Sequence, residues 1–328
     1  MAKIITHAAF FLLSLLVIGL YSIALYQAVR YNHIPSIFVI VIILIFMILR
    51  VKKGILKLKT QFLKYCLPSF KENQLKTIGI VILSSVLTYA INHYTELGSV
   101  IASSLVGLLG ALLFPKIEVP IYCGSFVGMT STGVLTNVEA VVISGFIAGL
   151  LLAGTQPLYV GYGGKLGACA FFGTMITAYF KNRFVFSDPN LIPRFDIMIP
   201  ALIVAGTIGT LWIRDYAKHS TVTSSAIIGI VGGLILPGLF PVHGSLYATT
   251  LFCGTFVGMS AFEHFRSYKF TIIAGLMCSL CYFYTSPIFP GKGGKLGALA
   301  FGAMIATSGI IHYYDDLYTP APPVDLEE

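Results

Sequence analysis

An eight-residue glycine-rich motif occurs twice in this chain, at a fixed distance from a second duplicated motif. Gly-Tyr-Gly-Gly-Lys-Leu-Gly-Ala occupies residues 161–168, and Gly-Lys-Gly-Gly-Lys-Leu-Gly-Ala occupies residues 291–298, 130 positions later. Tyr-Cys-Gly-Ser-Phe-Val-Gly-Met at residues 122–129 and Phe-Cys-Gly-Thr-Phe-Val-Gly-Met at residues 252–259 keep the same offset. Two motifs duplicated in the same register indicate an internal repeat, which constrains the fold more than any other feature of the sequence.

The composition is that of a chain lying mostly in lipid. Of its 328 residues, 56% are hydrophobic and only 10% are charged, and the mean hydropathy is +0.87, whereas a soluble domain carries about 25% charged residues. Apolar runs of about 17 to 21 residues recur, which is the length that a helix needs to cross a hydrocarbon core of roughly 30 Å. Backbone groups in lipid must pair within their own segment, so these runs are expected to be helices. The sequence therefore predicts an all-α, polytopic integral membrane protein of about 10–12 transmembrane or re-entrant helices, built from two internal structural repeats with broken helices.

The net charge of +8 does not indicate a nucleic-acid partner, because the densest basic block follows the second apolar run, where such residues mark the cytoplasmic side. The six cysteines fall in or beside apolar runs, without the spacing of a metal site, and are expected to pack as small apolar residues. They are Cys66, Cys123, Cys169, Cys253, Cys278 and Cys281. We expect neither a metal site nor a cofactor.

Two transmembrane helices are expected in the N-terminal region, residues 1–50, over residues 8–28 and 37–49. The first is interpreted as a retained anchor, because no small-residue cleavage site follows it and a second span does. In residues 51–76, lysines alternate with leucine, isoleucine and phenylalanine so that an apolar stripe lies opposite a basic face. This pattern predicts a basic amphipathic interfacial segment on an anionic membrane surface, with a plain cytoplasmic linker as the alternative. Either interpretation places the N-terminus in the cytoplasm.

The remainder divides into a first repeat at residues 77–181, a linker at 182–195, a second repeat at 196–312 and a disordered, acidic and proline-rich tail at 313–328. The relative orientation of the repeats depends on whether the Cys-Gly segments cross the membrane. If they cross, each repeat has five spans and the repeats are inverted; if they are re-entrant, each has four spans and the repeats are parallel. The positions of basic residues slightly favour the parallel arrangement. Inverted repeats are frequent in secondary transporters, and inversion is the arrangement that we expect.

The duplicated Gly-Gly-Lys sequence is the main candidate for a binding site. A glycine run that permits a left-handed backbone precedes an apolar helix, so the first turn exposes unpaired N–H groups at the positive end of the helix dipole. A lysine at that position completes a site for an anion. The predicted substrate-binding residues are Gly163, Gly164, Lys165, Gly293, Gly294 and Lys295. The alternative is that both lysines extend to the lipid headgroups at the membrane interface.

The Cys-Gly segments are the second candidate for substrate contact. The residues assigned to it are Cys123, Gly124, Ser125, Cys253, Gly254 and Thr255. Glycines four residues apart within each segment share one helix face, so close helix packing is an equally good explanation. No catalytic residue is expected, because no histidine or acid lies at a matching position in both repeats.

These features predict a transporter or channel, not an enzyme, that moves a small anionic solute through a pseudo-symmetric site between the repeats. It is expected to be a multi-pass protein of the cell (inner, cytoplasmic) membrane. Its expected partners are the anionic solute or a lipid headgroup, and the membrane lipids. A homo-oligomer is possible. Two alternatives remain: a lipid-handling protein, either a flippase or a lipid-phosphate-binding enzyme, and a non-transporting assembly or sensor subunit.

Overall fold

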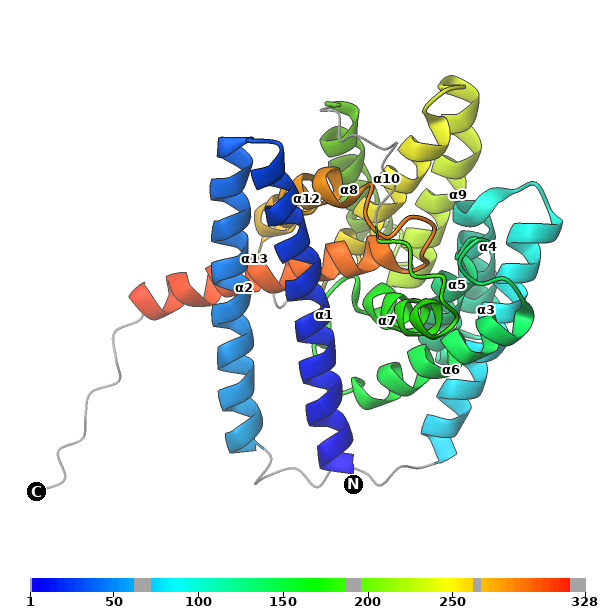
Figure 1. The fold of residues 1–328 in the computed structure, drawn as a ribbon, viewed down its shortest axis with the longest axis horizontal. Helices are drawn as coiled ribbons and strands as arrows, with labels where there is room; N and C mark the ends of the chain where they lie inside the picture. Colours follow the sequence, from blue (N-terminus) through cyan, green and yellow to red (C-terminus); the bar gives the residue numbers. More distant parts are fainter. Residues whose placement is uncertain (1, 62–71, 187–195, 262–266, 319–328) are drawn as a thin grey trace, which may run out of the picture.

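The computed structural model describes residues 2–61, 72–186, 196–261 and 267–318, and within these ranges every regular element is a helix (Figure 1). The N-terminal helices are α1 (Ala2–Arg30) and α2 (Ile34–Gln61). The first half contains α3 (Glu72–Tyr94), α4 (Gly98–Leu113), η1 (Pro115–Ile117), α5 (Glu118–Gly128), α6 (Val138–Gly154) and α7 (Lys165–Phe180). The second half contains α8 (Met198–Tyr216), α9 (Thr221–Leu239), α10 (Gly244–Gly258), α12 (Tyr268–Thr285) and α13 (Lys295–Tyr318).

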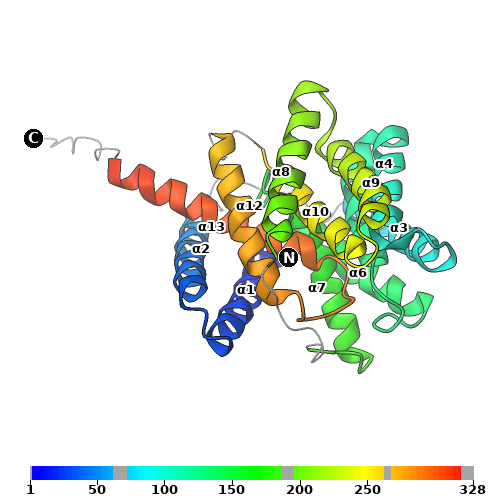
Figure 2. The same cartoon turned by 90° about the horizontal axis from the view of Figure 1, so that it is seen from above.

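Six of the described helices are long and apolar enough to cross a membrane, namely α1, α2, α3, α8, α9 and α13. Helices α4 and α6 are apolar but shorter. Seen from above, α1 and α2 lie on one side of the molecule and α3, α4 and α9 on the other, with α7 and α10 between them (Figure 2). The predicted all-helical fold, with several helices able to span a membrane, is therefore confirmed for the described residues.

Two predicted boundaries are wrong. The second span was expected over residues 37–49, but α2 continues without a break to Gln61, into the basic segment predicted from residue 51. Lysine and leucine are good helix formers and no proline occurs between residue 50 and Gln61, so nothing ends the helix there. Likewise, α13 continues to Tyr318 and includes the start of the predicted tail.

Some predicted segments fall partly outside the described residues. They are residues 62–71 of the predicted interfacial segment, 187–195 of the linker and 319–328 of the tail. The location of the basic segment on a membrane surface stays a prediction.

Helices α5 and α10 pack directly on the backbone of a longer helix in their own half. A Cβ added to Gly124 would strike the carbonyl oxygen of Val81 in α3, and one added to Gly254 would strike that of Ile203 in α8. Only glycine permits backbones to approach this closely. The glycines of the Cys-Gly segments therefore bring α5 and α10 against α3 and α8.

Helices α7 and α13 cross at their first turns. A Cβ added to Gly167 would lie 2.6 Å from the Cα of Gly297, and one added to Gly297 would lie 2.6 Å from the Cα of Gly167. Gly164 lies against the backbone of Phe301, further along α13, so the two helices run antiparallel at the crossing. Because the first turns of these helices meet, the two Gly-Gly-Lys segments lie close together in the interior.

Helices α3 and α8 run in opposite directions relative to the α1–α2 pair. In Figure 1, the N-terminus, the end of α2 and the beginning of α3 lie at the lower edge, and the turn between α1 and α2 lies at the upper edge. Residues at the start of α8 lie beside that turn, because Asp196, Ile199 and Pro200 share a cavity of about 370 Å³ with His33 and Ser36. Helix α8 thus begins at the end of the molecule where α3 finishes.

Candidate functional site

Each Gly-Gly-Lys segment begins a central helix, as predicted. Helix α7 starts at Lys165 and α13 starts at Lys295. The residues immediately before them, Gly164 and Gly294, have φ angles of 81° and 82°. This left-handed conformation favours glycine, so the second glycine of each segment is required by the backbone.

Each segment is held in place by a hydroxyl group from the other half. The N–H of Gly163 donates to Ser260 Oγ at 3.1 Å, and the N–H of Gly293 donates to Thr130 Oγ1 at 3.1 Å. Ser260 and Thr130 follow the ends of α10 and α5. The two halves therefore exchange equivalent hydrogen bonds across the interior.

The ammonium groups of the two lysines donate to backbone carbonyls at or just after the end of the preceding helix. Lys165 Nζ lies 2.9 Å from the carbonyl oxygen of Leu158 and 3.3 Å from that of Thr155. Lys295 Nζ lies 2.8 Å from that of Ile288 and 3.2 Å from that of Thr285. A cation near a helix C-terminus is favourable, because the dipole there is negative. This contact offsets the unfavourable position of each lysine at the start of its own helix.

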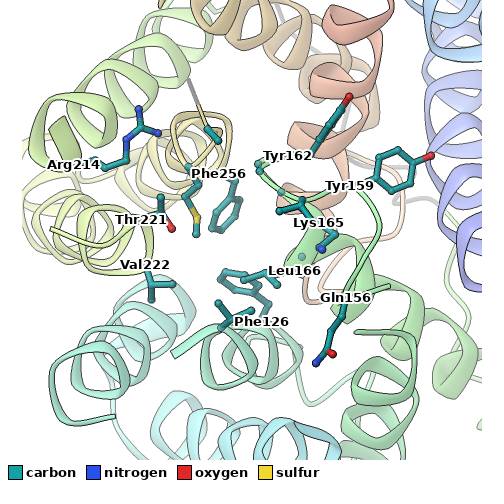
Figure 3. Close-up of a pocket in the computed structure, with 18 of the residues that line it drawn as sticks. Phe126, Gln156, Tyr159, Tyr162, Lys165, Leu166, Arg214, Thr221, Val222 and Phe256 are labelled. Atoms are coloured by element: carbon teal, nitrogen blue, oxygen red, sulfur yellow. The ribbon is translucent and has the colours of Figure 1, made fainter. Parts of the chain in front are cut away.

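A cavity of about 510 Å³ lies against the first Gly-Gly-Lys segment, and we call it the first cavity. Gly163, Gly164 and Lys165 form one wall, and Arg214 lies across from them (Figure 3). Arg214 pairs with Asp215, with Nε 2.7 Å from Oδ1.

A second cavity of about 280 Å³ lies against the other Gly-Gly-Lys segment. Its walls include Gly293, Gly294, Lys295 and Lys292, together with the hydroxyl-bearing residue Thr249. No aspartate or glutamate is among the described residues that line it. The two cavities share Phe126 and Phe256 as wall residues.

The cavities lie toward opposite ends of the α1–α2 pair. Tyr159, in the first cavity, stacks on Phe10 near the start of α1, with ring centroids 5.4 Å apart. Ser286, in the second cavity, lies two residues after Tyr284, whose hydroxyl donates to Ser36 Oγ at the start of α2. Because α2 returns antiparallel to α1, the starts of the two helices mark opposite ends of the molecule.

Different accessory elements hold the loops before α7 and α13. In the first loop, the Tyr162 hydroxyl accepts hydrogen bonds from Arg50 Nη2 at 3.0 Å and shares one with Ser308 Oγ at 2.6 Å. In the second loop, Lys292 Nζ donates to the carbonyl of Val185 at 2.8 Å.

The second loop has a further backbone contact with the chain that follows α7. The N–H of Phe289 donates to the carbonyl of Phe186 at 2.8 Å. Helix α2 therefore braces the first loop, and residues 184–186 brace the second.

Half of the predicted substrate-binding residues line the cavities. Those that do are Gly163, Gly164, Lys165, Gly293, Gly294 and Lys295. The six residues predicted from the Cys-Gly segments line neither cavity; these are Cys123, Gly124, Ser125, Cys253, Gly254 and Thr255. A role for this second set in substrate contact stays a prediction.

The two Cys-Gly thiols make equivalent contacts with the central helices. Cys123 Sγ and Cys253 Sγ donate to the carbonyls of Leu166 and Leu296, each at 3.4 Å. Both cysteines are fully buried. They therefore connect α5 to α7 and α10 to α13.

Sequence reasoning missed several residues of the cavity walls, above all Phe126 and Phe256. A signal for this pair was present, because both phenylalanines lie in the duplicated Cys-Gly motif at the repeat offset. Arg214 and Gln156 lie outside both duplicated motifs and offered no comparable signal. Among the described residues, no group of three or more histidine, cysteine, aspartate or glutamate side chains could hold a metal ion.

Replacing Arg50 with methionine is expected to destabilise the protein by about 1.5–3 kcal/mol, the usual contribution of a hydrogen bond to a charged group. The guanidinium holds the Tyr162 hydroxyl and Ser308 Oγ, the latter at 2.9 Å from Nε. Chemical unfolding in detergent would measure the loss. Lys52→Met, at an exposed position of the same helix, is the matched control. Equal stability of the Arg50 variant and the control would contradict the bracing role.

In comparisons with known proteins, no protein family, curated protein or solved structure matches this chain.

Proposed function

We propose that this protein is a membrane transporter or channel for a small anionic solute, with its path running through the two cavities. The observation that supports this most directly is that the cavities lie toward opposite ends of the α1–α2 pair and share the walls formed by Phe126 and Phe256. A transport path requires access from both faces of the membrane, and alternating access keeps the region between the two openings closed.

The proposed architecture is a pair of inverted structural repeats with broken helices. The opposite directions of α3 and α8, and the equivalent hydrogen bonds of Gly163 and Gly293, support it. Helix α5 has 11 residues, which rise about 17 Å and fall short of a hydrocarbon core of roughly 30 Å. In this arrangement α5 and α10 are the broken helices of the two halves. Binding sites of secondary transporters commonly form where such broken helices meet.

Charge favours an anion as the solute. The first cavity has Lys165 and Arg214 against the single carboxylate of Asp215, and the second has Lys292 and Lys295. The start of a helix adds the positive end of its dipole to each cavity. Since both ammonium groups of Lys165 and Lys295 already donate to carbonyls, they act mainly through their charge, and backbone N–H groups are the proposed direct ligands.

We place the protein in a cytoplasmic-type membrane with its N-terminus in the cytoplasm. Arg50, Lys52, Lys53 and Lys76 lie toward the end of α2 and the beginning of α3, at the end of the molecule that holds the N-terminus. Basic residues gather on the cytoplasmic side of membrane proteins. The first cavity then faces the cytoplasm and the second faces the opposite side.

Purified protein in liposomes is expected to release trapped chloride, inorganic phosphate or acetate at least about tenfold faster than protein-free liposomes, because electrostatic sites of this kind lower the barrier for anions. Potassium release, with the membrane potential clamped, is the control for non-selective leakage. If no anion in the panel is released, the proposal is wrong. Transfer of labelled phospholipid between leaflets in the same liposomes would instead favour the lipid-handling alternative.

A further inference from the structure

We propose that Phe126 and Phe256 form a closed aromatic gate between the two cavities. The inference rests on the proposed function, since it assigns the closed region of the transport path to one residue from each half. Both side chains line the first cavity and the second, and no other described residue lines both. A solute that passes from one cavity to the other must therefore pass these two rings.

The geometry of the pair is that of a closed contact. The ring centroids of Phe126 and Phe256 lie 4.8 Å apart with an interplanar angle of 67°, an edge-to-face arrangement. The two residues are only 2% and 3% exposed. Edge-to-face rings at this separation attract each other, so the contact is stable without a solute.

Two further rings support the gate from behind. Tyr122 lies 4.4 Å from Phe126, and Phe252 lies 4.6 Å from Phe256, measured between centroids. Neither supporting residue lines a cavity. The Tyr122 hydroxyl shares a hydrogen bond of 2.8 Å with Ser225 Oγ, which fixes its ring. The supporting rings therefore lie away from both cavities, whereas the gate rings face them.

The gate is connected to the proposed anion sites through the backbone. A Cβ added to Gly293 would strike the carbonyl oxygen of Phe126, and one added to Gly163 would strike that of Phe256. Each gate residue thus rests on the Gly-Gly-Lys segment of the other half. A shift of one segment on anion binding is transmitted directly to the backbone that positions the opposing ring.

Cysteine accessibility tests the gate without any substrate. Gln156 and Ser286 occupy equivalent positions in the two halves and line the first and second cavities, respectively. Each is replaced with cysteine in turn, in a chain where Cys66 is serine, and labelled from either side of a sealed membrane with a small, impermeant methanethiosulfonate. With native gate residues, Gln156→Cys should react from one side and Ser286→Cys from the other.

In each cysteine variant, the double substitution Phe126→Ala and Phe256→Ala should raise labelling at least about tenfold from the far side, the side from which the native-gate protein does not react. The reason is that both rings are removed from the path. Phe146→Ala is the control, since it removes a half-exposed phenylalanine ring of α6 that lines neither cavity. A double variant that still reacts from one side only would overturn the gate, and so would native-gate proteins that react from both sides.

Labelling from the near side, the side from which the native-gate protein reacts, shows that the variant is folded. If this near-side labelling is lost, Phe126→Leu with Phe256→Leu provides the same comparison with a smaller change in side-chain volume. If the labelling results support the gate but no anion is released from liposomes, the proposed solute is wrong. If anions are released but the double alanine variant is labelled like the native-gate protein, the gate alone is wrong.

Discussion

Replacing Lys165 and Lys295 together with methionine is expected to reduce anion release to the level of protein-free liposomes. Methionine has a similar length but removes the ammonium charge beside each helix start. Arg214, which is paired with Asp215, stays in the first cavity and Lys292 stays in the second, but the desolvation of an anion at the helix starts is no longer offset. It also leaves the carbonyls of Leu158 and Ile288 without their ammonium donors, which costs about 1–3 kcal/mol for each buried group left unpaired. The anion-release assay and a thermal unfolding curve in detergent separate the functional loss from the structural one.

Lys181→Met is the matched control for this experiment. Lys181 lies on the surface, 3.4 Å from Glu139, and both side chains are well exposed. Its replacement should leave anion release and stability unchanged. The double substitution Lys165→Arg and Lys295→Arg keeps the charge and should retain part of the release. Normal release by the methionine variant would rule out both lysines as parts of an anion path.

Replacing Gly167 with alanine is expected to prevent correct folding. The new Cβ would lie 2.6 Å from the Cα of Gly297, and backbone atoms of two central helices cannot yield as a flexible side chain can. Overpacking of a rigid interior commonly costs about 1–3 kcal/mol, and a clash between two backbones is expected to reach or exceed the upper end of this range. The yield of monodisperse protein in size-exclusion chromatography measures the effect.

Gly238→Ala is the control, because a Cβ at that position would meet nothing within 4 Å. Its yield should equal that of the native chain, and a helical alanine is slightly favourable. Gly297→Ala should fail in the same way as Gly167→Ala, since each glycine faces the other. If the Gly167 variant folds as well as the Gly238 variant, the two helices do not cross as closely as described.

The sequence predicted the features that depend on local chemistry. The two central helices begin at Lys165 and Lys295 because a glycine in the left-handed conformation precedes each of them. Since that conformation favours glycine, the Gly-Gly-Lys sequence alone was enough to predict both helix starts. Apolar runs likewise identified the long helices. The predicted end of α2 is wrong because a change from apolar to basic residues does not end a helix: lysine is a good helix former, and α2 continues to Gln61.

The features that depend on the packing of distant segments were not predictable. The lysine ammonium groups donate to main-chain carbonyls, and every residue has a carbonyl, so the sequence carries no sign of which ones are used. The pairing of Phe126 with Phe256 brings together two helices that lie far apart in the chain. Phenylalanine in an apolar run is usually interpreted as ordinary core, and only the duplication distinguishes these two.

The unequal bracing of the two loops has an energetic consequence for a protein that would alternate between two end states. One loop is fixed to α2 by the Arg50 guanidinium, and the other is fixed to a short connecting stretch by the Lys292 ammonium group and a main-chain bond. Two perfectly matched halves would make the inward-open and outward-open conformations equal in free energy. Because the restraints differ, we expect one orientation to predominate at rest, and a transporter built in this way would load preferentially from one side.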